Sequence, residues 1–131
     1  GIKDGLIDVI VSDHLPEDEE SKRLPFAQAA TGAIGVETLL PLSLEMYHNE
    51  SLPLNKIIET LTINPAKILK IKKGTLAKGS DGDICIFDLD APGKVVADKL
   101  KSKSKNTAIE GRNLQGKILM TYLNGELVYS N

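Results

Sequence analysis

The sequence predicts an α/β fold, in the form of the closing part of a (β/α)8 barrel followed by a smaller β region. An apolar run, Leu6–Val11, ends just before Asp13, apolar residues then recur at helical spacing, and short β-branched runs follow Gly74. A strand that carries a carboxylate at its carboxyl end is common in barrel enzymes. Because a whole barrel takes about 250 residues, we expect the 131 residues to be one piece of it.

The composition is that of a globular protein, with 41% hydrophobic and 26% charged residues. A net charge of −2 gives no general attraction to nucleic acid or to an acidic membrane surface. The single cysteine, Cys85, cannot form an internal disulfide, and we expect it to be a small buried hydrophobe in a reducing compartment. No segment has the pattern of a spanning helix or a signal peptide. These features favour a soluble cytoplasmic protein without nucleic-acid or membrane partners.

The first element is predicted to be a strand over Leu6–Val11. Apolar residues occupy both of its alternating faces except at Asp8, which is typical of a buried parallel strand. The residues from Leu15 to Gly35 show no sustained period. A loop of this length is uncommon unless it has a function such as lining a site.

Helical spacing predicts a first helix that starts near Glu37 or Thr38 and ends at about Tyr47. Pro41 must fall in its first turn or introduce a kink. The apolar residues that define this helix are Val36, Leu39, Leu40, Leu44 and Tyr47.

Two more helices are expected before Gly74. One begins after Ser51, which can cap it, has Pro53 in its first turn and carries an apolar stripe over 54–61. The pair Asn64-Pro65 fits the N-cap and first position of a short third helix, which Gly74 stops.

The second half is predicted to be β. Asp83–Asp88 reads as a strand buried on both faces, and Lys94–Ala97 as a weaker strand. Gly116–Leu123 and Glu126–Tyr129 flank Asn124-Gly125, which favours a type I′ hairpin. We therefore divide the chain into residues 1–73, with the barrel strand, site loop and helices, and residues 74–131, with the β region. Alternating lysines indicate a solvated loop or edge: Lys99, Lys101, Lys103 and Lys105.

Asp13 is the first candidate for chemistry. At a barrel mouth its carboxylate can bind a divalent metal and take a proton from a metal-bound water. The alternative is a turn aspartate that accepts hydrogen bonds from the following loop. His14 would point away from Asp13 on a strand, which favours a supporting role. His48, at a predicted helix end, suits the helix dipole better than a metal.

The chain cannot build a zinc site alone by any usual spacing. It has two histidines and one cysteine, with no HxH, HxxxH or CxxC pair, so it supplies at most one ligand. Gly32 and Gly35, in TGAIG, do not form a nucleotide-binding fingerprint. They indicate close backbone approach or a positive φ.

Five blocks give the chain a family resemblance. The segments DVIVSDHLP, LPFAQAATGAIGVETLLPL, TINPAKILKI, KGTLAKGSDGDICIFDLD and SKSKNTAIEGRNLQGKI together resemble the carboxyl-terminal third of a dihydroorotase, of the amidohydrolase superfamily. The third and fourth blocks alone would indicate only the superfamily. GVETLLP and SKSKNT separate the chain from the similar hydantoinases, dihydropyrimidinases and allantoinases.

The resemblance implies a zinc-dependent cyclic amidohydrolase that interconverts N-carbamoyl-L-aspartate and L-dihydroorotate in pyrimidine synthesis. The position of the family's zinc ligand and general base and acid is Asp13. The backbone that contacts substrate falls at Thr31 and Gly32. Residues 74–131 would form part of a small β-sandwich, and the complete protein would be a homodimer.

Two departures from the family pattern carry consequences. Glu17 stands where active members have a histidine that contacts the substrate carboxylate, and two buried carboxylates repel each other. Either Glu17 points to solvent and Lys22 or Arg23 replaces the histidine, or substrate binds poorly. The family's other metal ligands would lie upstream, in the remainder of the dihydroorotase chain, so we expect this chain to be inactive alone. The alternatives are a non-catalytic partner of aspartate transcarbamoylase and a hydantoinase-like enzyme.

Overall fold

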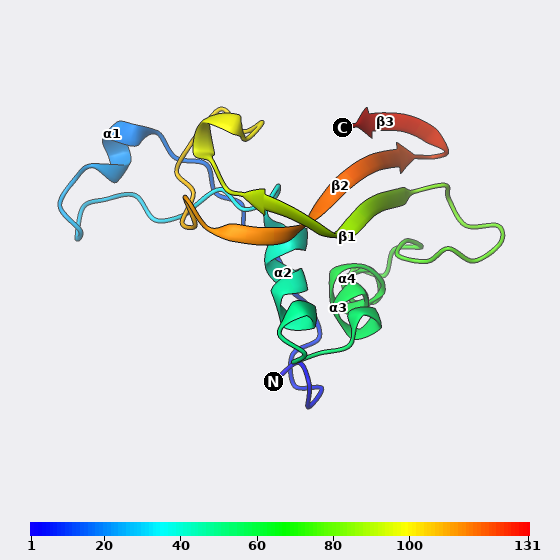
Figure 1. The fold of residues 1–131 in the computed structure, drawn as a ribbon. Helices are drawn as coiled ribbons and strands as arrows, with labels where there is room; N and C mark the ends of the chain where they lie inside the picture. Colours follow the sequence, from blue (N-terminus) through cyan, green and yellow to red (C-terminus); the bar gives the residue numbers. More distant parts are fainter.

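The computed structural model describes all 131 residues and combines short helices with one antiparallel sheet. Figure 1 shows the sheet on one side of α2, α3 and α4, while α1 lies apart from them. None of the helices has the length and apolar character needed to cross a bilayer. The elements are α1 (Glu19–Lys22), α2 (Leu39–His48), α3 (Leu54–Leu61), α4 (Ile63–Ile68), β1 (Ile84–Lys94), η1 (Ala97–Lys99), β2 (Asn113–Leu123) and β3 (Glu126–Ser130).

The predicted first helix is confirmed as α2, which follows Thr38. Pro41 lies in its first turn, where a missing N–H costs no helical hydrogen bond. Leu44 of α2 is fully buried, and α2 contacts both α3 and β2. At that contact Gly116 has φ +107°, and a Cβ added there would lie 2.5 Å from Leu44 Cδ1. A glycine is therefore required for α2 to pack this closely on the sheet.

The two following helices are confirmed, but their ends differ from the prediction. Ser51 does not cap α3, whose preceding residue is the extended Pro53. Helix α4 begins at Ile63, before the predicted Asn64-Pro65 start.

Helix α4 ends before Gly74, in a left-handed turn at Lys70, which has φ +56°. The N–H of Lys70 donates to Lys67 O at 3.2 Å, and the N–H of Ile71 donates to Ala66 O at 3.0 Å. This pair of bonds is the Schellman arrangement that satisfies the last helical carbonyls.

The sheet has the order β1-β2-β3, with antiparallel neighbours. The predicted strands 83–88 and 94–97 are wrong as separate elements, because one strand, β1, runs from Ile84 to Lys94 and Ala97 begins η1 instead. An irregularity between Asp88 and Pro92 breaks the pairing of β1 with β2. There the Asp88 carboxylate accepts the N–H groups of Asp90 and Ala91 at 3.0 and 3.1 Å, which supports the bulged backbone.

The predicted hairpin is confirmed. Strands β2 and β3 pair on either side of Asn124 and Gly125, which have φ values of +52° and +83°, as a type I′ turn requires. Asp83 holds the turn from the other side, since its Oδ1 accepts the Asn124 N–H at 2.8 Å. Its Oδ2 lies 2.5 Å from Lys73 Nζ, which also pairs with Asp81 at 2.8 Å.

The predicted burial of two strands is wrong. Residues 6–11 form no strand, because no neighbouring strand pairs with them; the helices contribute only the hydrogen bonds from Ile10 N–H to Thr60 O and from Asn64 Nδ2 to Asp8 O. Leu6 is 80% exposed and Val11 70%. Strand β1 is exposed along most of its length, so Cys85 and Ile86, which are adjacent and point to opposite faces, are both exposed instead of buried.

Much of the surface of the chain is uncovered. Its accessible surface is 9187 Å², whereas a compact monomer of this mass exposes about 6,800 Å². Only ten residues are buried; those among them that form the apolar core are Ile34, Leu44, Leu52, Ile57, Ala66, Val95 and Leu114. The core is therefore confined to the junction of the helices with β2 and with the segments that flank the sheet.

We predict that ionised Asp83 stabilises the fold, so that the free energy of unfolding falls when the pH is lowered into the acid range. The Asn124 N–H, together with Lys73, lowers the pKa of Asp83 below its ordinary value of 3.8. The contribution is fully present above the ordinary pKa and is lost as the pH falls through the lower, folded-state pKa. Thermal unfolding measured between about pH 2 and pH 6 should show falling stability below pH 4.

Replacement of Asp83 by Asn should make this acid dependence weaker. The matched control is Asp98→Asn, because Asp98 is exposed and forms no side-chain hydrogen bond. An Asp83→Asn protein with the acid dependence of the wild type would contradict the prediction.

Candidate functional site

Asp13 and Gly32 line the same groove, which has a volume of about 670 Å³. One wall is formed by residues 10–13 and 32–35, and the other by α2 with Ala108 and Ile109. Asp13 is exposed and has φ +44°, a left-handed conformation that aspartate tolerates better than most residues. The groove thus presents an accessible carboxylate above a largely apolar floor.

The backbone at Gly32 admits only a glycine without strain. Its φ is +113°, and an added Cβ would lie within 2.7 Å of three Leu15 side-chain atoms. Thr31 is exposed beside it but does not line the groove. The prediction of close backbone approach or a positive φ is therefore confirmed at Gly32.

The His14 side chain binds the backbone that leads into α2. Its Nδ1 accepts two backbone hydrogen bonds, from Gly35 N–H at 3.1 Å and Val36 N–H at 3.3 Å. His14 also pairs with Ala33 in an isolated parallel bridge. Because Nδ1 accepts from the backbone, it cannot bind a metal at the same time; the supporting role of His14 stays a prediction.

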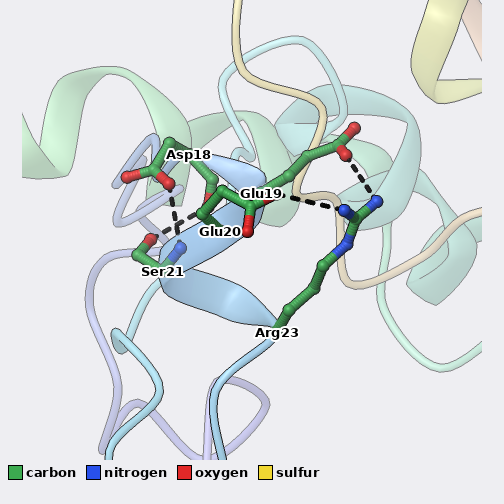
Figure 2. Close-up of polar contacts among 5 residues, drawn as sticks. All are labelled: Asp18, Glu19, Glu20, Ser21 and Arg23. Carbon is green, nitrogen blue, oxygen red and sulfur yellow. Dashed lines mark hydrogen bonds and ion pairs between the residues drawn. The ribbon is translucent and has the colours of Figure 1, made fainter.

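The acidic run after Asp13 is partly organised into α1. Asp18 caps α1 by accepting the Ser21 N–H at 2.8 Å, and this bond lowers the pKa of the Asp18 carboxyl. Arg23 donates to Glu19 at 2.8 Å and to Glu20 at 3.1 Å. Figure 2 shows that these contacts are local to the turn of α1. The Arg23 guanidinium is therefore paired within its own segment.

Glu17 and Lys22 differ in how their side chains lie relative to the groove and to Gly32. Glu17 is half-buried and is not among the residues that line the groove. Lys22 Nζ donates to the carbonyls of Ala30 at 2.7 Å and Gly32 at 3.0 Å. Of the two basic residues considered as replacements for the histidine, Lys22 is the one placed beside Gly32.

No three histidine, cysteine, aspartate or glutamate side chains come together as a metal site. The second histidine, His48, instead places Nε2 at 3.1 Å from Leu89 O in the β1 irregularity. Asp13 is the one predicted metal ligand, and the other acidic residue that lines the groove, Glu45, is paired with Arg112. The donor set of this chain therefore does not fit a complete zinc site.

Two residues with contacts at the site have no local sequence signal. Ser104 and Asn106, in the SKSKNT block, bond to the loop around Glu17 and to Gly32. Their partners are 74 to 91 residues away in sequence for Asn106, so periodicity and spacing give no indication of them. Only the recurrence of the block as a family signature could have drawn attention to them.

Residues 1–128 match the amidohydrolase family. The chain belongs to this family. The match runs through the groove, both segments that form its wall and nearly all of the sheet, so the family assignment covers the whole of the site described above.

Curated relatives of this amidohydrolase chain are dihydroorotases. It is 44% identical to a dihydroorotase of Ehrlichia chaffeensis over 98% of its own length and 29% of the relative. A dihydroorotase of Anaplasma phagocytophilum is 43% identical with the same coverage. The chain thus spans about 30% of the length of the curated relatives that it matches.

Similar solved structures are hydantoinases and dihydropyrimidinases. A dihydropyrimidinase from Brevibacillus agri NCHU1002 matches with a TM-score of 0.93 and 24% identity, over 99% of this chain and 30% of that one. The L-hydantoinase from Arthrobacter aurescens matches with a TM-score of 0.86 and 36% identity, over 98% and 30%. The first likeness shows the amidohydrolase fold of this segment.

We predict that His14→Ala will loosen the groove wall. The variant removes the acceptor of the Gly35 and Val36 N–H groups, at a cost of about 1 kcal/mol in the free energy of unfolding. Hydrogen exchange should become faster at these two amides. The control His48→Ala removes a contact with β1 and should leave both amides as in the wild type; unchanged exchange in His14→Ala would contradict the role of His14.

Proposed function

We propose that this chain is the part of a dihydroorotase that supplies the proton-transferring carboxylate and a substrate-facing stretch of backbone. The observation that carries the proposal is the shared groove of Asp13 and Gly32. It is supported by 44% identity to a dihydroorotase over 98% of the chain. The complete protein would reversibly hydrolyse L-dihydroorotate to N-carbamoyl-L-aspartate.

Asp13 would act as general base and then as general acid. In hydrolysis a water oxygen forms a bond to the ring amide carbon, and the ring C–N bond breaks. The carboxylate of Asp13 takes one proton of the attacking water and returns it to the departing nitrogen, while the other proton of the water is released to solvent when the new carboxyl group ionises at neutral pH. An exposed carboxylate at the groove is accessible to both atoms.

The backbone around Gly32 would orient the substrate, together with the adjacent Thr31. Gly32 has no side chain, so its peptide groups can approach a flat ring closely. Lys22 lies at the Gly32 carbonyl and brings a positive charge to the edge of the groove, where it would favour a substrate with carboxylates. Glu17 lies outside the groove lining, so its carboxylate would not face a substrate bound there.

In this proposal the complete protein depends on zinc, and this chain supplies only one of the ligands. Asp13 offers one carboxylate ligand, and this chain groups no further donors around it. A tetrahedral site needs about three protein ligands besides a water. A homodimer of complete chains and a cytoplasmic location belong to the same proposal.

A hydantoinase-like activity is the second candidate. The observation that favours it is the 36% identity to the Arthrobacter aurescens L-hydantoinase, at a TM-score of 0.86. Hydantoins are cyclic amides, so the same proton transfer by Asp13 would serve them. Activity of the complete protein on L-dihydroorotate and on a 5-substituted hydantoin, compared at equal concentration, separates the two candidates.

A non-catalytic role beside aspartate transcarbamoylase is favoured by one residue only. Glu17 replaces the histidine that active relatives use for the substrate carboxylate, as the family resemblance implies. The retained Asp13 favours catalysis instead. Absence of turnover in the complete protein, with normal folding and metal content, would select the non-catalytic role.

We predict that Asp13→Asn in the complete protein will lower kcat by about 10²- to 10⁴-fold, because the amide cannot accept the proton of water. Steady-state kinetics with L-dihydroorotate measure this loss. Asp8→Asn is the matched control, since Asp8 is exposed in the same segment and lies outside the groove. Near wild-type turnover in Asp13→Asn would end the general-base assignment.

We also predict that the 131-residue chain alone binds zinc weakly and does not hydrolyse L-dihydroorotate. One carboxylate cannot hold the ion tightly at neutral pH. Metal content after dialysis of the chain with equimolar zinc should be far below one ion per chain. Stoichiometric tight binding would contradict the account of the donor set.

A further inference from the structure

Three segments that are distant in sequence meet at the side chain of Asn106. Its Nδ2 donates to Leu15 O at 3.4 Å and to Gly32 O at 3.3 Å. Its Oδ1 accepts the Glu17 N–H at 3.3 Å and lies 2.5 Å from Ser104 Oγ. One amide thus joins the loop after Asp13 to the loop that contains Gly32, next to the direct backbone bond from Leu15 N–H to Ala33 O at 2.9 Å.

The hydrogen-bonding capacity of this amide is fully used. A carboxamide has two N–H donors and an oxygen with two lone pairs; in Asn106 both N–H groups have a carbonyl partner, and Oδ1 accepts the Glu17 N–H and shares the Ser104 hydroxyl hydrogen with Glu17 O. Both Nδ2 hydrogen bonds can form together only when the carbonyl oxygens of Leu15 and Gly32 lie at a suitable distance from each other. The Asn106 side chain therefore acts as a clamp between the two loops.

Ser104 and the main chain reinforce this clamp. The single hydroxyl hydrogen of Ser104 lies within reach of Glu17 O and of Asn106 Oδ1, which fixes the orientation of the amide. The Asn106 carbonyl accepts the Ile34 N–H at 3.3 Å, and Thr107 pairs with Ile34 in a parallel bridge. The clamp is thus anchored to a backbone that does not depend on the amide.

The clamp acts on both functional parts of the groove. Leu15 follows Asp13 by two residues, and its side chain is the one that a Cβ on Gly32 would meet. Displacement of Leu15 relative to Gly32 would change the distance between the Asp13 carboxylate and the backbone that faces the substrate. Misplacement of reacting groups by about 1 Å can cost 100-fold in rate.

We propose that Asn106 is a positioning residue of the active site, which sets the separation of Asp13 and Gly32 without touching the substrate. The proposal rests on the proposed function. Two kinds of experiment test it: kinetics in the complete protein, and a measurement of amide hydrogen exchange that needs no activity.

The kinetic test compares Asn106→Ala, Ser104→Ala and Asn55→Ala in the complete protein, with L-dihydroorotate as substrate. Asn55 is the control because it is exposed in α3 and makes no side-chain hydrogen bond. For Asn106→Ala we expect kcat/KM to fall by about 10- to 100-fold, through both kcat and KM, at unchanged metal content. Ser104→Ala should show a smaller loss in the same direction.

Two kinetic outcomes would overturn the proposal. One is a kcat/KM of Asn106→Ala within about threefold of the wild type, well below the loss that misplacement by about 1 Å causes. The other is a fall of kcat in proportion to lost metal or folded protein with KM unchanged, which is what a merely structural residue would give. If Asn106→Ala does not fold, Ser104→Ala decides, and a wild-type KM in that variant counts against the proposal.

Amide hydrogen exchange tests the clamp independently of activity. In Asn106→Ala the Glu17 N–H loses its acceptor and should exchange faster, whereas the Ile34 N–H keeps the main-chain carbonyl of residue 106 and should stay protected. Unchanged exchange at Glu17 would overturn the proposal. If the wild-type protein has no activity on L-dihydroorotate, the proposed function fails, and this measurement still decides whether Asn106 sets the groove.

Discussion

Leu44 of α2 contacts β2 at Gly116, where the structure has room for a hydrogen atom and not for a methyl group. This contact joins the helices to the sheet, and no other helix contacts the sheet as closely. Helix α2 also forms one wall of the groove, and His14 holds the backbone just before it. The packing of α2 on the sheet therefore determines the position of the groove wall that faces Asp13 and Gly32.

The features predicted correctly from sequence are those encoded locally. The apolar spacing of α2 and α3 and the Asn124-Gly125 turn depend on residues within a few positions of each other. Burial was predicted poorly, because an apolar residue is buried only if something packs on it. Leu6 and Val11 have the pattern of a buried strand but no partner in this chain. The continuity of β1 through Asp88–Pro92 depended on an irregular backbone that alternation does not encode.

The candidate site could be predicted in part. Asp13 and Gly32 were recognisable from an apolar run that ends in an acid and from a glycine in a long loop, and the two line one groove. Lys22 was considered only as a replacement for the histidine, and neither its contacts nor those of Asn106 with carbonyls of the loop around residue 32 were recognisable. Backbone carbonyls carry no sequence signature, so the residues that bind them are visible only in three dimensions.

The clamp at Asn106 also has a consequence for the order of events during synthesis. Its hydrogen bond to Leu15 spans 91 residues, and closing a loop of that length costs about 4 kcal/mol of chain entropy. A nascent chain that has passed Asp13 and Gly32 can form the bond from Leu15 N–H to Ala33 O, but it still lacks the amide that binds Leu15 O and Gly32 O together. The groove can therefore take its final shape only after the segment around residue 106 has left the ribosome, late in the translation of this part of the protein.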